Sequence, residues 1–231
     1  TSTVARKLAA AKSFLQYLYR IGKITKDPSR DIDPPKVDKA PPYAMSHDEI
    51  IRLLAEPAKS TTPKALRDKA ILELLYASGM RVTELVNLDL GDIDLSKQTV
   101  ICGINRSKQR TINLNKEVAD YLRVYLRQGR STMAAQNQKD EAGLFLNHRG
   151  QRLTRQGLWL IIKGYVEAVG IEENVTPHTL RHSFATHMLN SGTELKDLQE
   201  RLGHASIHTT QVYRQDQPSI VIDGKESKNE H

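Results

Sequence analysis

Apolar side chains recur every three or four residues in several stretches of the chain, a spacing that places them on one face of an α-helix. This pattern predicts a helix within residues 1–26, a second that ends at Gly79, and another that begins at Leu158. Further helices are expected near 179–190 and 194–202. The chain is therefore expected to be mainly helical.

Local signals mark where two of these helices begin and end. In "SHDE", Ser46 is followed three residues later by Glu49, and this pair forms a capping box at a helix start. Gly79 follows "LRDKAILELLYAS", and glycine readily takes the left-handed conformation that ends a helix. "RVTELVNL" then predicts a short helix directly after this glycine.

The pattern changes between Asp92 and Leu114. "TVIC" and "RTINL" are short and rich in β-branched residues, and the basic turn "GINRSKQ" separates them. Two such runs predict a small antiparallel sheet, and "GLFLNHRGQRLT" predicts a second hairpin. The expected fold class is α+β, mainly α-helical with a small antiparallel β-sheet.

The proline-rich stretch "DIDPPKVDKAPPYAM" divides the chain, because prolines resist both helix and strand pairing. We therefore expect a linker at 31–45 and a larger domain at 46–217. The amphipathic helix within 1–30 has no helices ahead of it in this sequence, so we expect it to be the last helix of a truncated N-terminal domain. The polar tail at 218–231 is expected to be disordered.

Charge and composition narrow the possible functions. The 231 residues include 34 Lys or Arg against 27 Asp or Glu, a net charge of +7. This excess suits a polyanion such as nucleic acid, although solubility alone can also explain it. A single cysteine, Cys102, excludes an internal disulfide and fits a reducing compartment. Without an 18-residue apolar run or a signal-peptide pattern, we expect a cytoplasmic protein with no membrane contact.

Polar residues that could take part in catalysis lie at the predicted helix ends. Arg81 follows the helix-ending glycine, and His178 lies three residues before Arg181, so both can face one target. His204 follows another helix stop, and Tyr213 comes nine residues later. Each has an ordinary explanation when taken alone: a surface charge, a solvated histidine or a core aromatic.

Together these residue types match the needs of phosphodiester cleavage without a metal. Two arginine forks can neutralise the non-bridging oxygens, and histidines can bind the same oxygens or accept a proton. A lysine can protonate the leaving alkoxide. A tyrosine nucleophile needs such neighbours, because the unperturbed pKa of tyrosine is about 10.

Two histidine pairs allow a rival interpretation as a zinc site. His178 with His182, and His204 with His208, have the four-residue spacing of paired zinc ligands. This interpretation is weaker, because no cysteine or acidic motif supplies further ligands nearby. It also leaves the two arginines and Tyr213 without a role.

The combined motifs resemble the tyrosine recombinase (integrase) family, and most closely its Xer recombinases. The stretches "LLYASGMRVTELVNL", "TPHTLRHSFATHMLNSGTELKDLQERLGH" and "TTQVY" carry the resemblance, which covers nearly all of residues 1–215. It implies site-specific strand exchange between double-stranded DNAs through a 3′-phosphotyrosyl intermediate, without ATP, metal or other cofactor. It further implies other recombinase subunits in a tetrameric synaptic complex, a catalytic domain at 46–217, and a core-binding domain to which residues 1–30 belong.

The resemblance also implies a role for each site residue. Tyr213 would be the nucleophile, and His178 the general base and a phosphate contact. Three residues would clamp the phosphate oxygens: Arg81, Arg181 and His204. Glu84, one turn after Arg81, matches the supporting carboxylate of the family.

One motif departs from the family pattern. Xer recombinases usually read Gly-Lys-Gly-Asn-Lys-Glu-Arg in the sheet turn, where the first lysine is catalytic, and that position here falls on Asn105 in "GINRSKQR". We assign the general acid to Lys108, with Arg106 as the alternative. The departure favours one rival function, a DNA-binding relative that has lost cleavage. A type IB topoisomerase, which uses similar chemistry, is a second rival.

Overall fold

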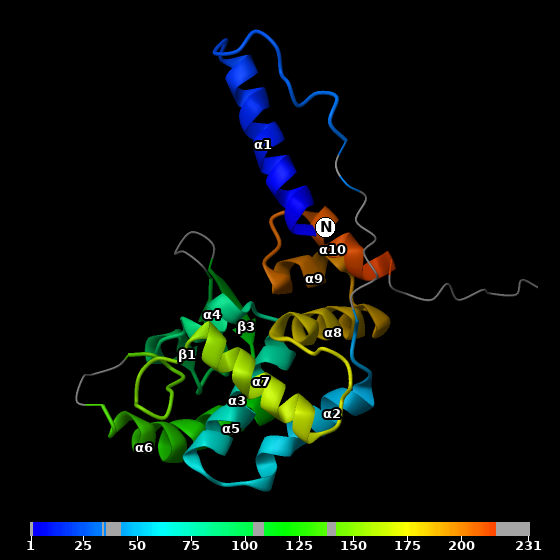
Figure 1. Cartoon of the computed structure of the whole chain (residues 1–231). Coiled ribbons are helices and arrows are strands. Elements are labelled where there is room, and N and C mark those ends of the chain that lie inside the picture. The colour runs from blue at the N-terminus through cyan, green and yellow to red at the C-terminus, as the bar shows by residue number, and fades with distance from the viewer. Residues whose placement is uncertain (1, 34, 36–42, 104–108, 138–141, 216–231) are drawn as a thin grey trace, which may run out of the picture. The chain divides into compact units, whose positions relative to one another are not determined.

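The computed structural model describes residues 2–33, 35, 43–103, 109–137 and 142–215. The chain divides into two compact units, residues 1–42 and 43–231 (Figure 1). The turn at 104–108 and the tail from 216 onward lie outside the described residues, and with them Lys108, Arg106 and the disorder expected of the tail.

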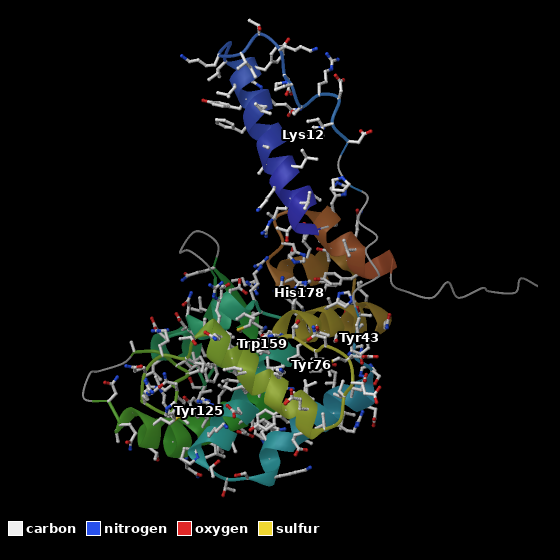
Figure 2. The ribbon with its side chains drawn as sticks, viewed as in Figure 1. Lys12, Tyr43, Tyr76, Tyr125, Trp159 and His178 are labelled. Atoms are coloured by element: carbon white, nitrogen blue, oxygen red, sulfur yellow. The ribbon has the colours of Figure 1, made fainter. Side chains whose placement is uncertain are left out.

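The first unit contains one helix, as predicted. It runs from Ser2 to Arg20 and is labelled α1 in Figure 1. Its apolar side chains are partly open to solvent, with Val4 59% and Phe14 61% exposed. Lys12, labelled on this helix in Figure 2, donates a hydrogen bond to the carbonyl oxygen of Ile32 at 2.5 Å.

The second unit is built around helix α3, Pro63–Ser78. Ile71, Leu72 and Leu74 of this helix are fully buried. Helices α2 (His47–Ala55), α5 (Lys116–Val124) and α8 (Pro177–Asn190) pack against it. Burying each large aliphatic side chain contributes about 1.5–3 kcal/mol to folding, so α3 anchors the core on which the rest of the unit is arranged.

The predicted signals at the ends of α2 and α3 are confirmed. Ser46 Oγ accepts from the amide of Glu49 at 3.3 Å, and Glu49 Oε2 accepts from the amide of Ser46 at 2.7 Å. Gly79 ends α3 in the left-handed conformation, with φ of 57°. A Cβ atom at Gly79 would lie 2.3 Å from a ring carbon of Phe184, so glycine also lets α8 approach closely. The short helix that follows, α4, spans Val82–Val86.

The small antiparallel sheet is also confirmed. Its strands are β1 (Ile93–Asp94), β2 (Thr99–Cys102) and β3 (Arg110–Asn113), with β2 in the centre. Cys102 pairs with Arg110 at the end of the β2–β3 ladder, next to the turn.

The second predicted hairpin forms only in part. The chain turns back between Leu146 and Arg152, which make a single antiparallel bridge, and no paired strands extend from it in the described residues. Backbone hydrogen bonds join the two arms of this turn, from the amide of Asn147 to the carbonyl of Gln151 at 2.7 Å and from the amide of Leu153 to the carbonyl of Phe145 at 2.8 Å. Side chains add to them. Tyr125 Oη donates to the carbonyl of Leu144 and accepts from the amide of Leu146, both at 3.1 Å, and the guanidinium of Arg130 donates to the carbonyl of Gly143.

Three helical segments between the sheet and this turn were not predicted. They are α5, a π-helical segment at Tyr125–Arg130 and α6 (Ser131–Ala134). Gly129 lies where the π-helical segment crosses the start of α3, and a Cβ atom there would meet the Pro63 carbonyl oxygen at 3.1 Å.

The predicted C-terminal helices are confirmed, and one more follows them. Helix α7 is Arg155–Ala168, α9 is Leu195–Leu202 and α10 is Ile207–Gln215. Helices α8, α9 and α10 pack against one another (Figure 1). The α+β fold class is thus confirmed. No described helix is long and apolar enough to cross a membrane.

Candidate active site

Two helix ends capped by glycine meet at the buried side chain of Arg181. Its Nη1 donates to the carbonyl of Gly79 after α3 at 2.5 Å, and its Nη2 donates to the carbonyl of Leu202 at the end of α9 at 2.8 Å. Carbonyl oxygens at helix C-termini carry partial negative charge and stabilise the cation. Burial, together with the charge of Arg81, lowers the pKa of Arg181 to about 10, so it remains charged at neutral pH.

Arg81 also contacts the C-terminal end of α9. It precedes α4, and its Nη2 donates to the carbonyl of Gly203 at 3.1 Å. Gly203 has φ of 63°, and a Cβ there would lie 2.9 Å from a guanidinium nitrogen of Arg110. The two arginines predicted as phosphate clamps, Arg81 and Arg181, therefore bracket one helix terminus.

Glu84 supports Arg81, and a third arginine supports Glu84. The Glu84 carboxylate accepts from the amide of Arg81 at 2.7 Å and from its guanidinium at 3.2 Å. Arg110 of β3 donates two hydrogen bonds to the same carboxylate, at 2.8 and 3.1 Å, and a third to the carbonyl of Arg201 at 2.7 Å. The prediction of site residues omitted Arg110.

The Glu84 carboxyl is ionised in this arrangement. Burial alone would raise its pKa, but the hydrogen bonds from Arg110 and from the Arg81 amide outweigh burial, so the pKa lies below its usual value. Two arginines thus face one carboxylate and leave one net positive charge. Arg181 adds another, so the site keeps two positive charges, enough to attract a phosphate diester.

His204 is joined to both Arg181 and α10. Its Nε2 lies 2.9 Å from Nη2 of Arg181, and its Nδ1 lies 2.9 Å from Oγ1 of Thr210. Burial, and then the charge of Arg181, lowers the pKa of His204 to about 4. The imidazole is therefore neutral at neutral pH.

Tyr213 lies on α10 and is 7% exposed. Its ring is nearly parallel to that of His204, with centroids 6.3 Å apart, and lies 5.2 Å from the ring of His182. The ring packs with Phe184 and Leu198, whereas no described residue makes a hydrogen bond with the hydroxyl. Tyr213 is thus both a packed aromatic and a neighbour of His204, which is hydrogen-bonded to Arg181.

His178 is the least anchored of the predicted site residues that the structure describes. His178 is in the first turn of α8 (Figure 2), where it is exposed and its side chain makes no hydrogen bond with a described residue. Lys108 lies outside the described residues, whereas Arg110, two positions later in the sequence, belongs to the site. No three His, Cys, Asp or Glu residues in the described ranges are grouped to hold a metal ion.

Comparison with known proteins identifies the class to which this site belongs. The sequence profile of the phage integrase family matches residues 44–219. The chain belongs to this family, the tyrosine recombinases.

Among its relatives are tyrosine recombinase XerC of Herpetosiphon aurantiacus, 51% identical over 92% of this chain and 69% of that protein, and XerD of Oceanobacillus iheyensis, 45% identical over 92% and 71%. The crystal structure of XerA recombinase is 31% identical, with a TM-score of 0.66 over 92% of this chain and 70% of XerA. The structure of XerH bound to palindromic difH substrate, 24% identical with a TM-score of 0.71 over 83% and 55%, shows the same fold.

The predicted resemblance and enzyme class are confirmed by these relatives: the protein is a tyrosine-type site-specific DNA recombinase. A relative that has lost cleavage and a type IB topoisomerase are not favoured.

Proposed function

We propose that Tyr213 cleaves one strand of double-stranded DNA and that the chain rejoins it to a partner strand. The tyrosine oxygen attacks the scissile phosphorus, forms a 3′-phosphotyrosyl bond and releases a 5′-hydroxyl. The 5′-hydroxyl of the partner strand then attacks this bond and frees the tyrosine. The number of phosphodiester-type bonds is conserved at each step, so the reaction needs no ATP, metal or other cofactor.

The observation that carries this proposal is the position of Tyr213 beside His204, the histidine that is joined to Arg181. Its ring stacks near His204, which is hydrogen-bonded to Arg181. Arg81 donates to the carbonyl of Gly203, at the C-terminal end of α9. In this proposal the two guanidinium groups and His204 bind the non-bridging oxygens and stabilise the charge that develops in the transition state.

Two further residues move protons. His178 accepts the proton of the tyrosine hydroxyl and contacts the phosphate; its exposed place at the N-terminus of α8 leaves it open to DNA. Lys108 donates a proton to the leaving 5′-oxygen, with Arg106 as the alternative in the same turn. Arg110, the first residue of β3 after this turn, is bonded to Glu84 in the site. This position supports a residue of the turn as the proton donor.

The partners and domains that we propose are those of tyrosine recombinases. We propose that residues 46–217 form the catalytic domain, that 31–45 is a linker, and that 1–30 contributes the last helix of a core-binding domain. Other recombinase subunits would complete a tetrameric synapse in the cytoplasm, where chromosomal DNA lies. The net charge of +7 and the DNA complex solved for XerH support DNA as the partner.

The test is covalent trapping on a suicide substrate, in which a nick near the cleavage site lets the 5′-hydroxyl fragment diffuse away. Wild-type protein should accumulate a covalent protein–DNA adduct. Tyr213→Phe should bind the same DNA and form none, because the variant lacks only the attacking oxygen. An adduct formed by the Phe variant would show that another tyrosine is the nucleophile.

A further inference from the structure

Thr210 connects the proposed nucleophile helix to His204. It lies on α10, one turn before Tyr213, and is 0% exposed. Its Oγ1 is 2.9 Å from Nδ1 of His204. The adjacent Thr209 is exposed, and its hydroxyl makes no hydrogen bond within the described part of the chain. One of two neighbouring threonines is therefore placed to act on the histidine.

The partners of the His204 ring fix its tautomer. A guanidinium can only donate hydrogen bonds, so Nε2, 2.9 Å from Nη2 of Arg181, must accept. The neutral ring then carries its proton on Nδ1 and donates it to Oγ1 of Thr210. In this state the ring has no N–H group to offer to a phosphate oxygen.

A hydroxyl can reverse its part in such a hydrogen bond. It has one proton to donate and lone pairs with which to accept, and it rotates to suit its partner. When Arg181 turns its donors toward a phosphate, Nε2 can take up a proton from solvent while Nδ1 loses its own to solvent. The ring stays neutral, and Thr210 rotates to donate its own proton to Nδ1.

We propose that Thr210 is a positioning residue for strand cleavage, whose hydroxyl accepts from His204 in the free protein and donates to it when Nε2–H faces the scissile phosphate. This inference rests on the proposed function of the site. Thr210 and Tyr213 share α10, so the hydroxyl that supports the donor tautomer of His204 is carried by the same helix as the proposed nucleophile. The nucleophile and this phosphate donor are thus brought into place by one helix.

The activity test compares three variants in single-turnover adduct formation at saturating suicide substrate. Thr210→Val has nearly the same shape but no hydroxyl, which leaves Nδ1 unsatisfied in the donor tautomer. We expect it to lower the cleavage rate constant about 10- to 100-fold, with little change in DNA affinity. Thr210→Ser should recover to within about threefold of wild type, and the control Thr209→Val should match wild type.

A spectroscopic test reads the tautomer without relying on activity. Two-bond ¹⁵N–¹H correlation spectra of labelled full-length protein should show the His204 proton on Nδ1 in the free state. In the complex of Tyr213→Phe with uncleaved DNA, the proton should be on Nε2. A ring that already carries its proton on Nε2 in the free protein, or does not change on binding DNA, would overturn the proposal.

A double variant separates this role from general destabilisation. In a His204→Ala background, Thr210→Val should cost no further cleavage rate. An equal loss in both backgrounds, or a Thr210→Val enzyme as fast as wild type, would overturn the proposal. A wild-type chain that forms no Tyr213 adduct would instead contradict the proposed function, and the NMR experiment would still decide the role of Thr210.

Discussion

Replacing Arg110 with methionine should destabilise the protein and slow strand cleavage through one cause, the unbalanced charge of Glu84. The Arg110 side chain is 14% exposed and that of Glu84 is 1% exposed, so the pair is shielded from water. Removing one partner of a buried ion pair typically costs about 3–5 kcal/mol, because the other charge is left without compensation. We expect a loss near 3 kcal/mol in the free energy of unfolding, since Arg81 keeps its own bonds to Glu84.

The effect on cleavage follows from the same charges. Without Arg110, the Glu84 carboxylate neutralises Arg81 and weakens the proposed grip of this arginine on the phosphate. Loss of one charge-assisted hydrogen bond costs about 1.5–3 kcal/mol, or roughly 10- to 150-fold in rate. Glu84→Gln keeps the shape of the side chain and an acceptor oxygen but removes its charge. The double variant Arg110→Met/Glu84→Gln should therefore cleave at least about tenfold faster than Arg110→Met alone.

Urea unfolding and single-turnover adduct formation measure the two effects separately. Arg123→Met is the matched control, because Arg123 pairs with Asp120 at the surface and should cost less than about 1 kcal/mol. If the double variant is as slow as Arg110→Met, the charge of Glu84 is not the cause. The bond from Arg110 to the carbonyl of Arg201 would then be the contact that matters.

Other measurements test separate parts of the structure. Lys108→Ala should cleave ordinary DNA slowly and be largely restored on a 5′-bridging phosphorothioate, because a thiolate leaves without a proton; wild-type speed on ordinary DNA would redirect attention to Arg106. Gly79→Ala should lower the free energy of unfolding by more than about 1 kcal/mol, given its positive φ and the close ring of Phe184. Gly164→Ala, inside α7 with open space around it, should raise that free energy by about 0.5–1 kcal/mol, and equal signs for the two variants would contradict this reasoning. Burial and the charge of Arg181 lower the pKa of His204 from its usual 6.5 to about 4 in the folded protein, so the unfolded chain binds more protons between these values. The contribution of His204 to stability should therefore fall as the pH drops from about 6.5 to 4. Unfolding curves of His204→Gln should show a shallower pH dependence in this window, and an unchanged slope would exclude His204 as the source.

The features predicted from the sequence are mostly those with local causes. The capping box at Ser46 depends on Glu49 three residues away, and the end of α3 depends on one glycine. The C-terminal helices were predicted from apolar periodicity, which reflects packing on a single face. Such signals lie within a few residues of the structure they determine, so they can be read without knowing the fold.

The features that the sequence analysis missed depend on contacts between residues that are far apart in the sequence. Arg110 lies 26 residues from Glu84 and 91 from Arg201, and no local pattern links it to either. The predicted hairpin near Leu146 is reduced to one bridge and a few backbone hydrogen bonds, and Tyr125 of the π-helical segment bonds to Leu146 there, a contact that no local pattern indicates. The motif "TTQVY" contains Thr210, but only the structure tells which of its two threonines meets His204. Roles for the six predicted site residues came from their order and from family resemblance, and they stay predictions.

The central claim is that one particular tyrosine of the eight in the chain forms the covalent bond to DNA. Adduct trapped on a suicide substrate can be digested with nuclease and protease, and the modified peptide sequenced by mass spectrometry. Our account predicts that the nucleotide remnant is attached to Tyr213, in the peptide that also contains Thr210. A remnant attached to any other tyrosine, or to a serine, would contradict it.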